Sequence, residues 1–217
     1  MSKAPKTETE RPAPRLYLVT PEVEDAAAFA RTLTDALGAA DIAAVLLRLK
    51  KADERTQINR IKTLASVVQP AGVALVLDGM PELAARGGAD GAHLNGFESF
   101  SAAVSSLKPE RIAGCGGLDS RDDAMTAAEE GADYVLFGEP DGNGDRPSLE
   151  SILERIEWWA ELFQVPCVAF AANADEVGPL AAAGADFVAI HYLWDDPRGV
   201  KPALTDAASK LTAEAVA

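Results

Sequence analysis

The chain has 217 residues, of which 48% are hydrophobic and 6% aromatic, so we expect an interior built mainly of Ala, Val, Leu and Ile. Its 34 acidic and 20 basic side chains give a net charge of −14, which argues against nucleic acid and anionic membrane surfaces as partners. The two cysteines are too few and too strand-like for a disulfide framework, which favours a reducing compartment, and the cysteines and two histidines lie too far apart for a zinc site.

The ends of the sequence and its hydropathy predict one cytoplasmic domain. Neither a signal peptide nor an apolar stretch of bilayer length is present. Residues 1–14 are polar, charged and proline-rich, and we interpret them as a disordered tail before a domain over 15–217. A small phosphorylated ligand is still compatible with the acidic composition, because a pocket can be locally basic.

Short apolar segments alternate with segments of helical periodicity along the domain. The predicted strands are, in chain order, Leu16–Val19, Ile42–Leu49, Val73–Asp78, Gly91–Leu94, Arg111–Cys115, Tyr134–Phe137, Val165–Phe170 and Phe187–Ile190. The predicted helices between them include one that starts at the cap signal Thr20-Pro21-Glu22, one over Met80–Ala85, one over Glu98–Leu107, and a last one over Pro202–Val216.

A recurring Gly-Ala-Asp motif marks where helices end and strands begin. It occurs at Gly88, Gly131 and Gly184, and Gly38-Ala39-Ala40-Asp41 is a looser fourth copy. Glycine adopts the left-handed conformation that ends a helix, so each copy predicts a helix-to-strand junction. Repeated junctions of this kind predict parallel strands separated by helices. Eight units predict a single TIM (β/α)8 barrel, with a doubly wound open sheet as the alternative.

Polar residues at strand ends are the candidates for chemistry, because a TIM barrel builds its site there. Arg48 and Lys50 alternate at the end of the second strand, and we expect them to share a face that binds a phosphate or diphosphate. Surface salt bridges are the alternative. Asp78 ends the third strand and Glu98 follows the fourth, and they are candidate oxygen ligands for Mg²⁺. The alternatives are that Asp78 caps the following helix and that Glu98 is an acid in the first turn of its helix.

Other strand ends supply further candidate ligands of a substrate. These are Asn95, Gly116 in a glycine-rich turn, Glu139, Asn173 and His191. His93 and His191 are interpreted first as packing histidines and second as acid–base groups. Trp158 lies about 100° around its helix from the core residue Trp159, as expected for consecutive helical residues. It is either a contact between subunits of a homo-oligomer or a side chain packed laterally within one chain.

The order and spacing of these segments resemble thiamine-phosphate synthase and its sister enzyme, the thiazole tautomerase, from Arg15 to about Trp194. The resemblance rests on Leu46-Leu47-Arg48-Leu49-Lys50, on the segment from Gly88 to Glu98 and on the segment from Gly131 to Gly138. It implies a transferase of thiamine biosynthesis that joins a pyrimidine diphosphate to a thiazole phosphate and releases pyrophosphate, assisted by Mg²⁺. It also implies that Arg48 and Lys50 stabilise the departing pyrophosphate, while Asp78 and Glu98 hold the metal.

Several positions that carry the chemistry of this family differ here. Residues 139–146 replace its T-x-T-K loop, with Arg146 as a candidate substitute for the lysine and Glu139 where the tautomerase has its catalytic histidine. Ala171-Ala172 replace the paired glycines whose amides hold the thiazole phosphate. The alternative function is therefore a divergent relative without synthase activity, which binds or processes another phosphorylated or heteroaromatic molecule, or which is not catalytic.

Overall fold

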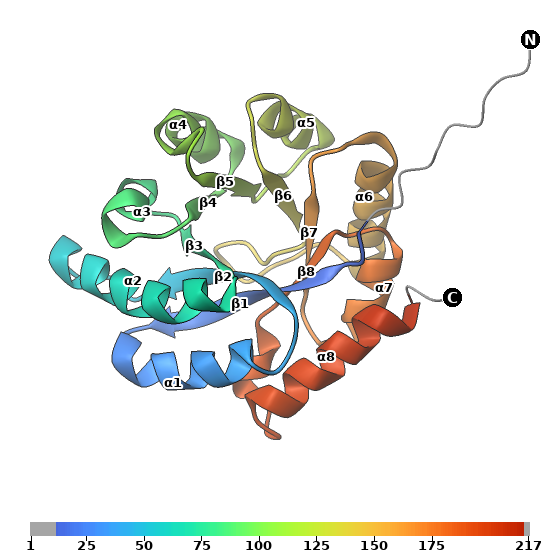
Figure 1. The fold of residues 1–217 in the computed structure, drawn as a ribbon. Coiled ribbons are helices and arrows are strands. Elements are labelled where there is room, and N and C mark those ends of the chain that lie inside the picture. Colours follow the sequence, from blue (N-terminus) through green and yellow to red (C-terminus); the bar gives the residue numbers. More distant parts are fainter. Residues whose placement is uncertain (1–11, 215–217) are drawn as a thin grey trace, which may run out of the picture.

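The computed structural model describes residues 12–214, which form a closed barrel of eight parallel strands surrounded by helices (Figure 1). The strands are β1 (Arg15–Val23), β2 (Ile42–Leu49), β3 (Ala74–Asp78), β4 (Gly91–Asn95), β5 (Ile112–Gly116), β6 (Tyr134–Phe137), β7 (Cys167–Ala171) and β8 (Phe187–Ile190). Each strand pairs with its neighbours in the sequence, and β8 pairs with β1 to close the circle. The predicted TIM barrel is confirmed, and the open sheet is excluded.

A helix follows each strand and covers the outside of the barrel. The helices are α1 (Ala26–Leu37), α2 (Glu54–Val68), α3 (Pro81–Gly87), α4 (Phe97–Leu107), α5 (Arg121–Glu129), α6 (Leu149–Leu162), α7 (Val177–Ala182) and α8 (Val200–Glu214), with short 3-10 helices η1 (Gln69–Ala71), η2 (Ala174–Glu176) and η3 (Tyr192–Asp195). Residues 1–11 of the predicted tail and residues 215–216 of the predicted last helix lie outside the described residues. Within residues 12–214, no helix has the length and apolar composition needed to cross a membrane.

The first strand is longer than predicted, and the cap signal proposed at Thr20-Pro21-Glu22 is wrong. A bulge after Val19 lets the chain continue as a strand, so that Glu22 pairs with Arg48 of β2. The Thr20 hydroxyl accepts the Arg48 backbone N–H at 2.9 Å and thereby supports the bulge. The true cap of α1 is Asp25, whose carboxylate accepts the N–H of Ala28 at 3.0 Å.

The Gly-Ala-Asp motif does more than end helices. Gly88, Gly131 and Gly184 adopt φ angles of 77°, 101° and 99°, as the left-handed cap requires. The aspartate then accepts a backbone N–H from the first or second residue of the preceding strand. The distances are 2.7 Å from Leu75 to Asp90, 2.8 Å from Ala113 to Asp133 and 2.8 Å from Cys167 to Asp186. All three bonds lie at the amino-terminal end of the strands, where recurring residues serve stability.

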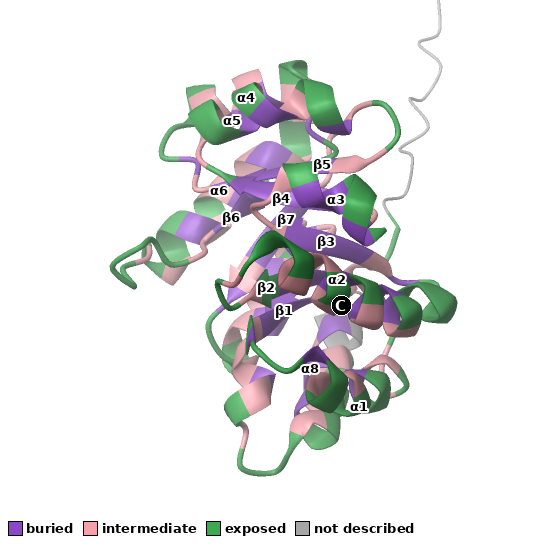
Figure 2. Cartoon of the chain, turned by 90° about the vertical axis from the view of Figure 1, so that its left-hand side faces the viewer, coloured by how far each residue is buried: buried purple, intermediate pink, exposed green. Residues whose placement is uncertain are grey.

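Alternation along the strands separates two buried layers. Leu16 and Leu18 of β1 pack outward against the helices, whereas Tyr17 and Val19 belong to a second cluster inside the barrel. Figure 2 shows the buried strands in purple and the exposed outer surfaces of the helices in green. Since side chains fill the barrel interior, it is a packed core, and a ligand can enter only above it at the carboxyl ends of the strands.

Trp158 of α6 packs within the chain. Its ring is half-buried and meets Trp159 and Phe163 edge-on, with ring centroids 5.7 Å and 5.3 Å away. The guanidinium of Arg121 lies 4.6 Å above the ring. This arrangement is the lateral packing within one chain that was one of the two alternatives for Trp158. A homo-oligomer through Trp158 stays a prediction.

Candidate functional site

A cavity of about 310 Å³ opens above the packed interior of the barrel. The polar residues of its wall occupy, on several strands, the inward-facing position that follows the last residue of the packed interior. On β2, for example, Arg48 follows the inward-facing Ala44 and Leu46. The same alternation places Asp78 of β3, His93 of β4 and Phe170 of β7 in its wall. Asn95, Glu139 and His191 also line the cavity. The structure thus brings together five of the predicted site residues: Arg48, Asp78, Asn95, Glu139 and His191.

Arg48 and Asp78 form an ion pair at the rim of this cavity. Arg48 Nε donates to Asp78 Oδ2 at 3.1 Å, and the side chains are 44% and 33% exposed. The pair is partly solvated, so it contributes little to stability. The terminal nitrogens of Arg48 make no bond to any other described residue and are available to an anionic ligand.

Lys50 does not share the cavity with Arg48. Strand β2 ends at Leu49, and the Lys50 N–H donates to the carbonyl of Val23 at the end of the lengthened first strand. The Lys50 ammonium then pairs with Glu24 at 2.7 Å, outside the cavity lining. For Lys50, the structure therefore shows the surface salt bridge that was the alternative to phosphate binding.

Glu98, Asn173 and Gly116 also lie away from the cavity lining. Glu98 is exposed in the first turn of α4, as in its alternative interpretation as a first-turn acid. Asn173 caps η2 through its side chain. Across residues 12–214, no group of three or more acidic, histidine or cysteine side chains is arranged to hold a metal ion. The predicted pair of metal ligands is therefore represented at the cavity by Asp78 alone.

Glu139 is folded back into the barrel mouth from the end of β6. Its Oε1 accepts the N–H of Gly117 at 2.5 Å and lies 4.0 Å from Nε2 of His93. A side chain at Gly116 would collide with Glu139 Oε1 and His93 Nε2. Gly116 therefore makes room for this carboxylate instead of lining the cavity itself.

Burial shifts the pKa of both groups toward the uncharged form. It raises the pKa of Glu139 to about 7, against the opposing effect of the Gly117 N–H. It also lowers the pKa of His93 to about 4, so this imidazole is neutral near pH 7. The floor of the cavity thus offers a neutral imidazole beside a carboxyl that can exchange its proton near neutral pH.

A buried hydrogen-bond chain fixes the tautomer of His93. Its Nδ1 lies 3.0 Å from the Tyr134 hydroxyl, which lies 2.8 Å from the Tyr17 hydroxyl. All hydrogens find acceptors if Tyr17 donates to Tyr134 and Tyr134 donates to Nδ1. The reverse direction would leave the buried Tyr17 O–H without an acceptor. We therefore assign the ring hydrogen to Nε2, which faces Glu139.

This tyrosine chain was not predicted from the sequence. Tyr17 and Tyr134 lie 117 residues apart, and each could be read as an ordinary apolar strand residue. Both tyrosines occupy inward-facing positions of their strands, as His93 does. Because a buried hydroxyl needs a hydrogen-bond partner, this shared orientation is the signal from which the chain could have been predicted.

His191 is oriented by the bulge in β1. Both His191 Nδ1 and Trp194 Nε1 approach the carbonyl oxygen of Val19, at 3.1 Å and 2.7 Å. Because a carbonyl only accepts, Nδ1 carries a hydrogen and donates it to Val19. His191 is thus held in a fixed orientation at the wall of the cavity.

Arg146, the candidate substitute for the missing lysine of the 139–146 loop, is bonded to other residues of the chain. Its guanidinium donates to the carbonyls of Gly138 and Phe170, each at 3.0 Å. It also forms an ion pair with Glu176 at 2.9 Å. All of its nitrogens are thereby engaged, and Arg146 does not line the cavity itself, although its guanidinium lies 6.0 Å from the ring of Phe170, which does.

Comparison with known proteins agrees with the motifs. The thiamine monophosphate synthase family model matches residues 16–192. Thiamine-phosphate synthase of Rhodospirillum centenum is 42% identical over 88% of this chain and 95% of its own length, and that of Hyphomonas neptunium is 36% identical over 89% and 92%. The solved thiamine phosphate pyrophosphorylase of Pyrococcus furiosus shares the fold, with a TM-score of 0.75 and 22% identity over 92% of this chain and 96% of its own. The chain therefore belongs to the thiamine monophosphate synthase family, as the sequence motifs predicted.

Proposed function

We propose that this chain is a transferase that joins a pyrimidine diphosphate to a thiazole phosphate and releases pyrophosphate, in the biosynthesis of thiamine. The observation that carries the proposal is the composition of the cavity above the barrel. Arg48 offers unpaired guanidinium nitrogens at its rim, while Leu46, Leu136 and Phe170 offer apolar surface for a heteroaromatic ring.

The reaction exchanges one bond for another. The C–O bond between the pyrimidine methylene and the diphosphate breaks, and the electron pair leaves with the diphosphate. The thiazole nitrogen then donates its lone pair to the methylene carbon. Arg48 stabilises the negative charge that develops on the leaving diphosphate, and this is the main way in which the chain's own residues accelerate the step.

The remaining candidates take supporting roles in this proposal. Asn95 and His191 offer hydrogen bonds to the rings, and the floor is formed by the neutral imidazole of His93 and by Glu139, whose carboxyl can exchange its proton near neutral pH. Lys50 would reach the diphosphate only after releasing Glu24. Neither Glu98 nor Asn173 lines the cavity, so their predicted roles would need a rearrangement of the rim.

Mg²⁺ is part of the proposal as an escort of the diphosphate. Magnesium is commonly held by one or two carboxylates together with substrate phosphates, and Asp78 at the cavity rim fits that requirement. When bound, the ion would neutralise part of the charge of the leaving group.

A second candidate is a divergent relative that takes a neutral or cationic heteroaromatic ligand. It is favoured by the excess of acidic groups at the cavity, where Asp78, Glu139 and Asp141 stand against Arg48. Such a wall repels a diphosphate unless a cation accompanies it.

An assay of both products decides between these candidates. With both substrates and Mg²⁺, the wild type should form thiamine phosphate and pyrophosphate in equal amounts. Arg48→Ala should lower kcat/KM by at least about 100-fold, as loss of a charge-stabilising donor does. Arg31→Ala, which removes an exposed guanidinium on α1, should leave it unchanged. Absence of product, with equal thermal stabilisation by the pyrimidine alcohol and its diphosphate, would favour the second candidate.

A further inference from the structure

Glu139 is a buried carboxylate to which the proposed transfer assigns no bond-making step. It lies two residues beyond the end of β6, and its side chain is 16% exposed at the wall of the cavity. Its Oε1 accepts the Gly117 N–H at 2.5 Å, and among the described residues no lysine or arginine forms an ion pair with it. A carboxylate in this position has either to keep its charge without a cationic partner or to bind a proton.

The arginines near Glu139 are committed to other partners. Glu139 also lines a second cavity, of about 480 Å³, whose wall contains Arg146 and Arg155. Arg146 pairs with Glu176 at 2.9 Å, and Arg155 donates to backbone carbonyls of the loop after β5, at 2.7 Å and 3.2 Å. Neither guanidinium is bonded to Glu139, so neither compensates its charge directly.

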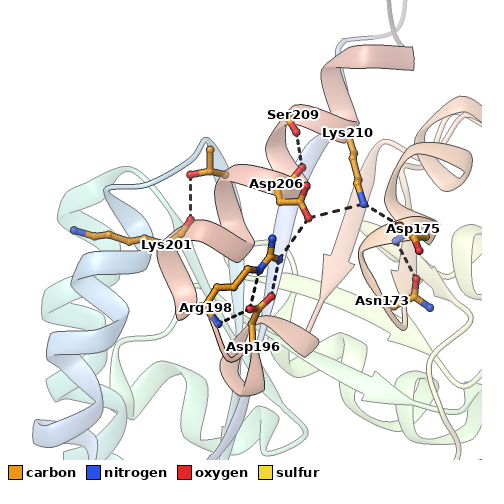
Figure 3. A network of polar contacts seen from close by, with 9 residues as sticks. Asn173, Asp175, Asp196, Arg198, Lys201, Asp206, Ser209 and Lys210 are labelled. Atoms are coloured by element: carbon orange, nitrogen blue, oxygen red, sulfur yellow. Dashed lines mark hydrogen bonds and ion pairs between the residues drawn. The ribbon is translucent and has the colours of Figure 1, made fainter.

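The cations beyond β7 and β8 are engaged as well. Figure 3 shows Arg198 paired with Asp196, at 2.7 Å. It also shows Lys210 between Asp175, at 3.0 Å, and Asp206, at 3.9 Å. These two cations are therefore held by aspartates of their own loops and of α8.

The cavity wall contains further negative charge. Asp78 is paired with Arg48, whereas Asp141 has no cationic partner among the described residues. Hydrogen bonds from backbone N–H groups of its own loop hold the pKa of Asp141 below its ordinary value, so this carboxylate is charged at neutral pH. His191, the titratable group of the lining besides His93, donates through Nδ1 to a backbone carbonyl. Apart from the buried carboxyl itself, the lining thus sets two carboxylates against one guanidinium.

The remaining titratable groups around this carboxyl are uncharged at neutral pH. Burial lowers the pKa of His93 to about 4 and raises the pKa of the Cys115 thiol to about 12. It also raises the pKa values of Tyr17 and Tyr134. Nothing among these groups offsets the burial that raises the pKa of Glu139 to about 7. An anion that entered the cavity would raise this pKa further, because like charges favour the protonated form.

We propose that Glu139 sets the charge of the ligand that this cavity accepts: a polyanion binds together with one proton, which the Glu139 carboxylate takes up from solvent. The proton forms an O–H bond on the carboxyl, and no other covalent bond changes. Arg48 then attracts the anion against fewer negative neighbours. That the polyanion is the diphosphate of a pyrimidine rests on the proposed function, whereas the coupling between anion and proton does not.

Titration with inorganic pyrophosphate measures this coupling without any turnover. At pH 7.5, calorimetry in buffers of different ionisation enthalpy counts the protons taken up per bound ligand. Because Glu139 titrates near pH 7, the wild type should take up about 0.7 more protons than Glu139→Gln, which keeps the side-chain size but cannot bind the proton. The protons that pyrophosphate itself exchanges cancel in this difference. Glu139→Gln should also bind pyrophosphate about tenfold more tightly than the wild type at pH 8, and about equally at pH 6.

Asp141→Asn is the matched control. It also removes one carboxylate charge from the cavity lining, but from a group that is ionised throughout this pH range. This variant should gain affinity for pyrophosphate by the same factor at pH 6 and at pH 8, and it should take up as many protons as the wild type. If Glu139→Gln does not fold, infrared difference spectra of the wild type give the same readout, because pyrophosphate should convert a carboxylate band into the C=O band of a protonated carboxyl.

Equal proton uptake in the wild type and Glu139→Gln would overturn the proposal, since another group such as His191 would then carry the proton. Loss of the uptake in Asp141→Asn would overturn it too, and so would absence of pyrophosphate binding to the wild type from pH 6 to pH 8. A failed synthase assay leaves this titration unaffected, because it contains neither the pyrimidine nor the thiazole. Product formation without proton uptake would refute the coupling and leave the transferase function standing.

Discussion

Deleting single hydroxyls from the Tyr17–Tyr134–His93 chain tests the direction of its hydrogen bonds. Tyr134→Phe removes the central hydroxyl, which is bonded on both sides, at 2.8 Å to Tyr17 and at 3.0 Å to His93. Two buried groups then lose their partner, the Tyr17 O–H and the His93 Nδ1. An unsatisfied buried group costs about 1–3 kcal/mol, so this variant should lose about 2–6 kcal/mol of unfolding free energy.

Tyr17→Phe removes the same atom type from the end of the chain. Tyr134 then still donates to His93, and no donor is left unsatisfied. The expected loss is one net hydrogen bond, about 0.5–1.5 kcal/mol. The double variant leaves only His93 Nδ1 without a partner and should therefore be more stable than Tyr134→Phe alone.

Urea unfolding of the three variants at one pH, followed by circular dichroism, measures these differences. Equal losses for the two single variants would refute the assigned direction, and so would a double variant that is less stable than Tyr134→Phe. The order of the three stabilities is the readout, and it does not depend on the absolute cost of an unsatisfied group.

Three further predictions concern the site and the base of the barrel. The pKa of Glu139 in the folded protein, about 7, lies above its ordinary value of 4.5, so the stability of the wild type should fall as the pH rises from 4.5 to 7. Over that window, urea titrations should show that Glu139→Gln gains up to about 3 kcal/mol of unfolding free energy relative to the wild type. A difference between the two proteins that does not change with pH would contradict this prediction. Gly116→Ala should displace the Glu139 carboxylate and lower kcat/KM by about tenfold or more. Gly142→Ala, whose added methyl group meets no atom within 4 Å, should leave kcat/KM unchanged. Equal activities of the two variants would refute the view that Gly116 makes room for Glu139. Asp90→Ala should cost about 1–3 kcal/mol of unfolding free energy in thermal or urea unfolding, because the N–H of Leu75 loses its acceptor. Asp41→Ala is the control and should cost about 0–1 kcal/mol, since its carboxylate lies in an exposed ion pair. The reverse order would disprove the role of Asp90 as an acceptor of the strand N–H.

The sequence predicted the barrel and part of the site because both depend on local periodicity. The alternation of Ala44, Leu46 and Arg48 is sufficient to aim the guanidinium inward, and Asp78 follows the same rule on the next strand. Lys50 escapes that rule, since the bulge in β1 lengthens the strand pair and brings Glu24 within reach. A bulge in one strand cannot be seen in the pattern of its neighbour.

The parts that the sequence did not predict depend on contacts between distant residues. Glu176 reads locally as an ordinary acid in the first turn of a short helix, and its role comes from Arg146, which is 30 residues away. Glu139 was a candidate ligand, but its inward fold depends on the absence of a side chain at Gly116. Contacts of this kind depend on tertiary packing, which residue propensities and the periodicity of the sequence do not report.

The aspartates at the base give the barrel a hidden division into quarters. Each ties the start of an even-numbered strand to the start of the odd-numbered strand before it, at β3–β4, β5–β6 and β7–β8, whereas β1–β2 has the weaker, exposed ion pair between Arg15 and Asp41 at the same end. Every quarter therefore carries its own fastening at the end remote from the chemistry. Loops at the opposite end can therefore differ, as residues 139–146 differ from the T-x-T-K loop of the family, while the two strands of each pair keep their alignment.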